Sequence, residues 1–281
     1  MNEAGARARN LEIADIEYRR EGSAPLLARL YRPEGAGPFP AAVEVHGGAW
    51  IMNDRTTNAS IHRPLAESGV AVMAVDFRMA PQWPYPAGIA DINYEVRWLK
   101  TEGRKFGVDP KRVGGVGLSS GGHQLILSAM RPADPRYAAL PLPEGEKADA
   151  SLAFAVLCWS IVDPLARYRM VKANGNERLQ KAHEAYWRSE AEMSEGNPQL
   201  ILERGERVRL PPLLYLQGTN DDNVTPDMAQ RFVAAYARAG GEAALETFAG
   251  QPHAFIARNP EAPAAKDAVA RIVEFVHKRT R

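Results

Sequence analysis

The residue with the clearest chemical potential is Ser119, which stands in the segment Gly-Leu-Ser-Ser-Gly-Gly at positions 117–122. The segment fits the pattern G-x-S-x-G and lies between an apolar run and a helical pattern. In so tight a strand-to-helix turn, flanking side chains would strike the neighbouring elements, so glycine is required there. Such a turn presents a serine hydroxyl as a nucleophile at a helix N-terminus, which favours developing negative charge. Ser120 is a weaker candidate, because the position two before it is occupied by Leu118.

A second segment could stabilise negative charge on a reacting oxygen. Positions 46–50 are His-Gly-Gly-Ala-Trp and directly follow an apolar run over residues 41–45. Acyl transfer builds an anionic oxygen in its transition state, and fixed backbone N–H groups stabilise that oxygen. Glycines let the backbone come close to a substrate. Together with the serine motif, this segment indicates an oxyanion hole.

An acid and a base follow in the order expected for a serine, acid and histidine on an α/β sheet. The segment Gly-Thr-Asn-Asp-Asp-Asn-Val at 218–224 offers Asp221 and Asp222, and Asp163 is a third candidate after an earlier strand. His253 lies between the last predicted strand and the last predicted helix. From that place a loop histidine can reach the serine.

These motifs together resemble a known family. The segments at 46–50, 76–81, 85–87 and 117–123 come in the order and at the spacing of the hormone-sensitive-lipase-like esterases. Small bacterial carboxylesterases, acetyl-xylan and feruloyl-type esterases and arylformamidases are closely similar, and the resemblance covers the chain from about Ala41 onward. Ala49 replaces the third glycine of the lipase-type motif, which is more similar to the arylformamidase and feruloyl-esterase branch. Leu118 stands where lipase-like members usually carry an acid.

The resemblance implies roles for individual residues. Backbone N–H groups of Gly48, Ala49 and Ser120 would form the oxyanion hole. The segment 218–224 is similar to one in prolyl-oligopeptidase-like hydrolases, which makes Asp221 the acid of a triad with Ser119 and His253.

The elements that must position these residues alternate along the chain. We expect antiparallel strands at 11–19 and 25–31, followed by apolar runs at 41–45, 70–77, 113–118, 152–159 and 213–217 and a weaker run at 243–248. Helical patterns cover 61–68, 89–101, 122–130, 227–239 and 264–278. Unbroken apolar runs are typical of strands buried on both faces. The alternation therefore predicts a mostly parallel α/β sheet flanked by helices, and the resemblance implies that this is the α/β-hydrolase fold.

One connection is too long for an ordinary crossover. We interpret 160–212 as a helical cap inserted before the last two strands, with 1–159 and 213–281 as the core. A crossover helix with long loops is the alternative. We expect Trp50, Tyr186 and Trp187 to form a substrate-binding surface; the alternative is that the aromatic residues pack the core of the cap itself.

Composition limits the partners. The chain has 281 residues and one cysteine, Cys158. Because its formal net charge is only +1, we expect it to bind neither nucleic acid nor an anionic membrane. Met1 to Asn10 has no apolar core of a signal peptide, and no apolar stretch approaches the length of a membrane span. We expect a cytoplasmic protein that forms no internal disulfide, needs no cofactor or metal and could be a homodimer.

The sequence predicts a serine carboxylesterase that hydrolyses small, short-acyl or aryl esters through an acyl-enzyme intermediate. An arylformamidase, or another small amidase or peptidase using the same triad, is the alternative. A non-catalytic binding protein on this fold is disfavoured, because such proteins lose a member of the triad and Ser119, Asp221 and His253 are all present.

Overall fold

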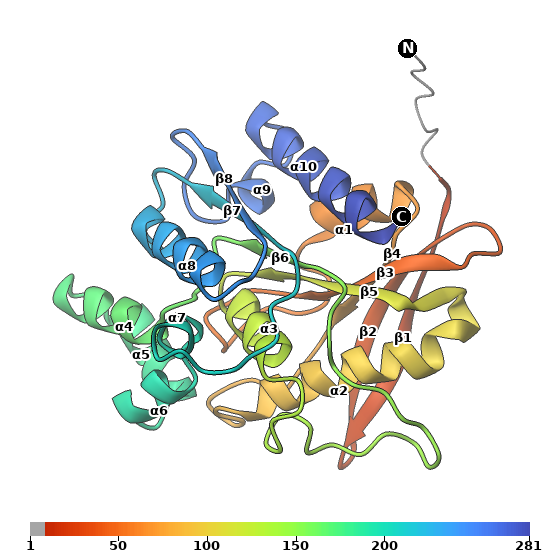
Figure 1. The fold of residues 1–281 in the computed structure, drawn as a ribbon, viewed down its shortest axis with the longest axis horizontal. Helices are drawn as coiled ribbons and strands as arrows, with labels where there is room; N and C mark the ends of the chain where they lie inside the picture. The colour runs from red at the N-terminus through yellow and green to blue at the C-terminus, as the bar shows by residue number, and fades with distance from the viewer. Residues whose placement is uncertain (1–8) are drawn as a thin grey trace.

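The computed structural model describes residues 9–281, so most of the segment Met1 to Asn10 lies outside the described residues. Within that range a single sheet runs through the molecule (Figure 1), with its strands in the order β1-β2-β4-β3-β5-β6-β7-β8. The strands are β1 (Leu11–Glu21), β2 (Ala24–Pro33), β3 (Phe39–Val45), β4 (Ala71–Val75), β5 (Val108–Leu118), β6 (Ala155–Cys158), β7 (Leu213–Gly218) and β8 (Ala243–Phe248).

The pairing of the strands confirms a mostly parallel sheet with an antiparallel start. β1 pairs with β2, and β2 with β4, in antiparallel fashion, and all remaining pairs are parallel. β5 begins at Val108, earlier than the apolar run at 113–118 suggested, because Val108 already pairs with Phe39 at the start of β3. The intervening residues are polar or proline, so no apolar run marks this part of the strand.

Helices cover both faces of the sheet (Figure 1). The helix α1 (Ala59–Glu67) lies with α9 (Phe255–Arg258) and α10 (Pro263–Thr280) on one face. The other face carries α2 (Ala87–Glu102), α3 (Ser120–Met130) and α8 (Pro226–Arg238), and the 3-10 helix η1 (Gly103–Phe106) follows α2. Among residues 9–281 no helix has both the length and the apolar character to span a bilayer.

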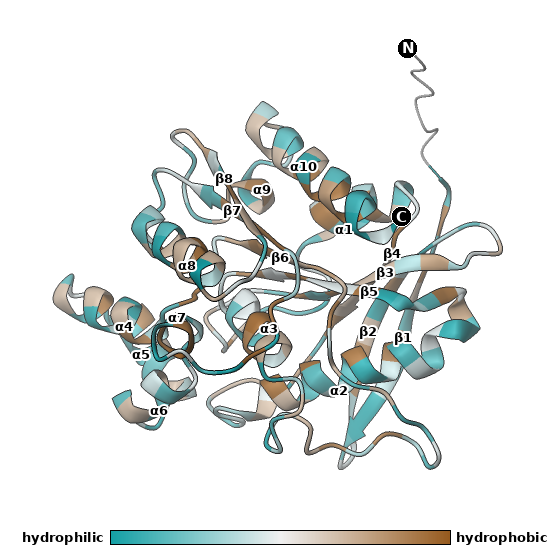
Figure 2. Ribbon diagram, in the orientation of Figure 1, coloured by the Kyte–Doolittle hydropathy of each residue, from teal (hydrophilic) through white to brown (hydrophobic). Residues whose placement is uncertain are grey.

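Burial explains why the central strands form unbroken apolar runs. Every residue of β3 and β4 is buried, because helices exclude water from both faces of these strands. Figure 2 shows hydrophobic residues on the central strands and a mixture of hydrophobic and hydrophilic residues along α8 and α10. Such helices bury one stripe against the sheet and leave the other in water.

The segment 160–212 folds into short helices: α4 (Pro164–Ala173), α5 (Glu177–Tyr186), α6 (Glu190–Glu195) and α7 (Pro198–Glu203). Each is preceded by a capping residue whose side-chain oxygen accepts a backbone N–H of the first turn, namely Asp163, Asn176, Ser189 and Asn197. The helices α5 and α6 are separate, because Trp187 is extended and Ser189 caps the start of α6.

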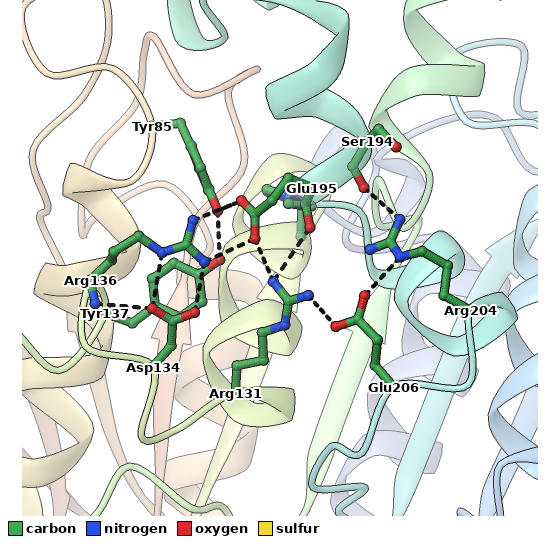
Figure 3. Close-up of polar contacts among 11 residues, drawn as sticks. Tyr85, Arg131, Asp134, Arg136, Tyr137, Ser194, Glu195, Arg204 and Glu206 are labelled. Atoms are coloured by element: carbon green, nitrogen blue, oxygen red, sulfur yellow. Dashed lines mark hydrogen bonds and ion pairs between the residues drawn. The ribbon is translucent and has the colours of Figure 1, made fainter.

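A polar network centred on Glu195 joins this segment to the core (Figure 3). The Glu195 carboxylate accepts hydrogen bonds from the Tyr85 hydroxyl at 2.6 Å and from Arg131 at 2.7 Å. Arg136 donates to both of its oxygens, at 2.9 and 2.8 Å. Burial alone would raise the pKa of Glu195, but hydrogen bonds from Arg136 and Tyr85 lower that pKa to about 2. The carboxylate is therefore ionised and multiply bonded at the junction.

We predict that Glu195→Gln lowers the free energy of unfolding by about 1–2 kcal/mol, because its partners lose a charged acceptor. Glu190→Gln is the matched control from the same segment, since within residues 9–281 Glu190 forms its one ion pair with the exposed Arg169. We expect a change of about 0.5 kcal/mol or less. Urea unfolding measures both. The depressed pKa means that the contribution of Glu195 is present above pH 4.5 and is lost as the pH falls toward 2. Equal effects of the two substitutions would contradict the prediction.

Candidate active site

The candidate residues meet at the carboxyl ends of parallel strands. Ser119 follows β5, Asp221 follows β7, His253 follows β8, and the loop of Gly48 follows β3. Loops at this edge of a parallel sheet converge, which is why ligands of α/β proteins bind there. Residues separated by up to 134 positions are thereby brought into contact.

Ser119 occupies a strained turn between β5 and α3. Its φ and ψ are 51° and −119°, a conformation that costs a residue with a side chain about 1–3 kcal/mol. A Cβ at Gly117 would lie 2.6 Å from the Cα of Gly122, and one at Gly121 would lie 2.2 Å from the carbonyl oxygen of His46. Glycine is therefore required on both sides of the serine, as the sequence motif predicts.

The three candidate side chains form a continuous hydrogen-bonded chain. The Ser119 Oγ lies 3.1 Å from the Nε2 of His253, and the His253 Nδ1 lies 2.9 Å from the Oδ2 of Asp221. All three residues are buried, with Asp221 only 3% exposed. Both distances are within the reach needed for proton transfer and for holding an imidazole in one orientation.

The surroundings of the acids distinguish Asp221 from its alternatives. Its Oδ1 accepts the N–H groups of Asn223 and Val224, both at 2.9 Å, and its Oδ2 also accepts the Gln217 amide at 3.1 Å. Asp222 is exposed to solvent. Asp163, the third candidate, instead caps α4 and accepts a hydrogen bond from the side chain of Asn197.

The loops that carry the acid and the histidine are joined by backbone hydrogen bonds. Thr219 N–H donates to the carbonyl of Phe248 and Asn220 N–H to the carbonyl of Gln251, both at 3.0 Å. A Cβ at Gly218 would lie 2.2 Å from the Gln251 carbonyl oxygen, so the close approach needs glycine. The distance between Asp221 and His253 is thus fixed by main-chain contacts.

The loop after β3 adopts a backbone that explains its glycines. Gly48 has φ of +120°, and a Cβ there would lie 2.1 Å from the carbonyl oxygen of Met52. Ala49 and Trp50 also have positive φ, of 52° and 64°. The Trp50 N–H donates to the Ser120 Oγ at 3.1 Å, which joins this loop to the start of α3. The His46 Nδ1 lies 2.7 Å from the Gly47 oxygen of the same loop.

The predicted oxyanion donors, the N–H groups of Gly48, Ala49 and Ser120, belong to the two segments that this hydrogen bond joins. Within residues 9–281 the N–H groups of Gly48 and Ala49 donate no hydrogen bond to another group of the chain. Ser120 is the first residue of α3, where a backbone N–H has no helical partner. All three groups are therefore available to an anionic oxygen.

A cavity of about 300 Å³ opens onto Ser119 and His253. Gly48 and Ala49 line it, and so do three arginines, Arg167, Arg178 and Arg258. The arginines come from α4, α5 and α9, so the segment 160–212 contributes two of them. No sequence motif marks these positions, because nothing in a single sequence reveals which arginines face a shared cavity.

Trp50, Tyr186 and Trp187 do not line this cavity, contrary to the expected substrate contact. They are 1%, 0% and 2% exposed and belong to one hydrophobic cluster. The rings of Trp50 and Tyr186 stack with centroids 4.9 Å apart, and Trp187 packs against both. Large aromatic side chains gain most by burial against one another, and here they join the segment 160–212 to the loop after β3.

His123 completes this contact from α3. Its Nδ1 lies 3.2 Å from the indole nitrogen of Trp50, and its Nε2 lies 2.9 Å from the Gly196 carbonyl oxygen. Burial lowers the pKa of His123 to about 4, so the neutral ring accepts from Trp50 and donates to Gly196. The histidine therefore packs in the first turns of α3.

The fold and the geometry of the site define an α/β-hydrolase with a serine, histidine and aspartate arranged for nucleophilic catalysis. The family model described as BD-FAE matches residues 29–236, and the chain belongs to that family. This agrees with the resemblance to hormone-sensitive-lipase-like and feruloyl-type esterases.

Proteins similar to this chain are esterases. A probable carboxylic ester hydrolase, LipM of Mycobacterium tuberculosis, is 28% identical over 235 residues, which are 78% of this chain and 50% of that protein. An ethyl acetate hydrolase of Pseudomonas putida is 28% identical over 179 residues, 62% of this chain and 53% of the relative. The chain thus spans about half the length of these curated relatives.

Solved structures show the same fold. A hyperthermophilic esterase of Pyrobaculum calidifontis matches with a TM-score of 0.76 and 22% identity, covering 96% of this chain and 87% of the other. Esterase B of Lactobacillus rhamnosis matches with a TM-score of 0.79 and 20% identity, again covering 96% and 87%.

We predict that Asp221→Asn lowers kcat for ester hydrolysis by about 10⁴-fold, because an amide can hold the wrong tautomer of His253. Asp222→Asn is the matched control on the neighbouring residue, and we expect kcat to stay within about threefold, since exposed substitutions act weakly. Steady-state kinetics of both variants on one aryl acetate tests this. The reverse ranking in kcat would assign the acid to Asp222.

Proposed function

We propose that this protein is a serine carboxylesterase that acts on small-molecule esters through an acyl-enzyme. The observation that carries the proposal is the hydrogen-bonded chain from Asp221 through His253 to Ser119, facing a cavity lined by the glycine loop after β3. The esterase names of the relatives support this reading over the alternative of an amidase or peptidase.

The mechanism follows from the atoms that face one another. His253 Nε2 takes the proton of Ser119 Oγ as that oxygen attacks the ester carbonyl. The N–H groups of Gly48, Ala49 and Ser120 stabilise the resulting oxyanion. His253 then gives the proton to the leaving alcohol. The bond between the carbonyl carbon and the alcohol oxygen breaks, which leaves an acyl-serine. Water, deprotonated by the same imidazole, releases the acid, and Asp221 stabilises the imidazolium throughout.

The segment 160–212 acts in this proposal as a cap on one side of the cavity. It contributes Arg167, Arg178 and Leu179 to the cavity lining, while its aromatic residues fix it to the core. A cavity of about 300 Å³ suits a short acyl group or an aryl group better than a long chain. A cytoplasmic location and a homodimer remain predictions from the sequence.

Ser119→Ala should abolish ester hydrolysis, with a loss in kcat of at least about 10⁴-fold, because the attacking oxygen is removed. The variant should also lose stoichiometric labelling by a fluorophosphonate, which reacts with an activated serine. Ser128→Ala, at a buried serine of the helix α3 that follows Ser119, is the control and should keep both properties. A Ser119→Ala protein that retains a tenth of the wild-type activity would contradict the proposal.

We expect kcat/KM for p-nitrophenyl esters to peak at acyl chains of about two to six carbons and then fall toward laurate. Each buried methylene adds about 0.8 kcal/mol until the cavity is full, after which further methylenes clash or stay in water. Trp187→Ala is a control for the role of the aromatic cluster: its ring is buried away from the cavity. The substitution should lower stability by about 3–5 kcal/mol without moving the peak. A series that rises steadily to laurate would contradict the small-ester assignment.

A further inference from the structure

The lining of the cavity at Ser119 carries positive charge and contains no carboxylate. Arg167, Arg178 and Arg258 all line it, and no aspartate or glutamate does. In the described part of the chain none of the three forms an ion pair with a carboxylate. Most other arginines in that part do, as Arg131 does with Glu195 and Glu206. A cleft lined by charge of one sign concentrates ligands of the opposite sign.

Arg167 is the buried member of this group, with 1% exposure. Its guanidinium donates to the carbonyl and side-chain oxygens of Asn223 and to the Nε2 of His183, all neutral acceptors. Burial, together with the positive charge of Arg167, lowers the pKa of His183 to about 2, so that imidazole is neutral and accepts. A guanidinium has five N–H donors, and these bonds leave at least two of them unused.

Arg167 nevertheless stays charged. Burial lowers its pKa to about 10, the charge of Asp221 opposes that change, and the charge of Arg178 adds to it. Asp221 is already bonded to His253, Gln217 and two backbone N–H groups. The two guanidinium groups therefore repel each other across the cavity, and a bound anion would relieve this repulsion.

Arg178 and Arg258 are exposed at the mouth, and they also line a second cavity of about 310 Å³ beside His253. The two cavities share these arginines, Leu179, Asn223 and His253, so they lie next to each other on the histidine side. Asp222 is the one carboxylate that lines the second cavity within residues 9–281. The second cavity is thus lined by two arginines and one carboxylate, and Arg167 lines the first cavity next to it.

We propose that the natural substrate carries a carboxylate on its alcohol portion, and that Arg178 and Arg258 bind this carboxylate at the mouth of the cavity above the positive floor made by Arg167. This inference rests on the proposed esterase function and names its substrate class. A guanidinium presents a planar pair of donors that matches a carboxylate, which favours this anion.

The placement on the alcohol portion follows from the mechanism. His253 must protonate the leaving oxygen, so the leaving alcohol lies on the side of the imidazole. The second cavity opens on that same side and contains both exposed arginines. An anion on the acyl portion would instead follow the carbonyl carbon bound to Ser119.

The test compares two esters of nearly equal shape, 4-acetoxybenzoate and its neutral amide 4-acetoxybenzamide, by kcat/KM with the purified full chain. We expect the anionic ester to be favoured by about tenfold. In the Arg178→Gln/Arg258→Gln protein this ratio should fall about tenfold, and Asp222→Asn should raise it about threefold by removing the one opposing charge. These sizes correspond to roughly 0.5–1 kcal/mol for each partly exposed charge pair.

Arg238→Gln removes an exposed arginine of α8 that lines neither cavity and should leave the ratio unchanged. A wild-type ratio of one or less, or a ratio that the double substitution leaves intact, would overturn the inference while hydrolysis of 4-acetoxybenzamide still upholds the esterase. A larger preference for monophenyl succinate over phenyl succinamate would overturn the placement on the alcohol. Absence of hydrolysis of every ester, with no labelling of Ser119, would reject the esterase and the inference together.

Discussion

The absence of side chains at Gly117, Gly121 and Gly122 is the constraint on which the site depends. Each of these glycines admits a different neighbour: Gly117 the first turn of α3, Gly121 the loop after β3, and Gly122 the Ser160 side chain, whose Oγ would lie 1.8 Å from a Cβ. A Cβ at Gly117 or Gly121 would meet backbone atoms of α3 or of the loop after β3, and one at Gly122 would displace the Ser160 side chain. The strained φ of the serine is maintained because these contacts surround it from three directions.

The same packing explains how the site combines order with charge. Aromatic residues from the segment 160–212 fill the space beside the loop after β3, so that loop holds its positive φ angles without contact from a substrate. Two charged residues of the segment, Arg167 and Arg178, line the cavity. Burying Arg167 with neutral acceptors alone is costly, since a charge loses its hydration. Contacts elsewhere in the segment, such as the network around Glu195, offset that cost.

The sequence was sufficient for the features that depend on local chemistry. Ser119, Asp221 and His253 could be placed because each follows a buried strand, and the glycines around the serine have a steric reason that spacing alone conveys. Trp50, Tyr186 and Trp187 could not be placed, because a bulky ring next to a catalytic loop fits a cavity wall and a packed core equally well. Arg167 and Gln217 were missed for a related reason. Arg167 owes its importance to Asn223, which lies 56 positions away, and Gln217 owes its importance to a contact with Asp221 across the turn after β7; no periodicity encodes either contact.

In the proposed function, stability and selectivity depend on different faces of the helices in 160–212. Tyr186 at the end of α5 packs against Trp50 and is fully buried, whereas Arg178 near its start is exposed at the cavity. Substitution of a buried ring leaves a void and loses several kcal/mol, but an exposed residue can change at little cost to folding. Esterases of this fold at 20–22% identity keep the sheet while most side chains differ. Under the proposed function, substitutions at exposed positions such as Arg178 can therefore change which ester charge is preferred. The distances around Ser119 stay fixed, because buried rings such as Tyr186 hold the helix in place.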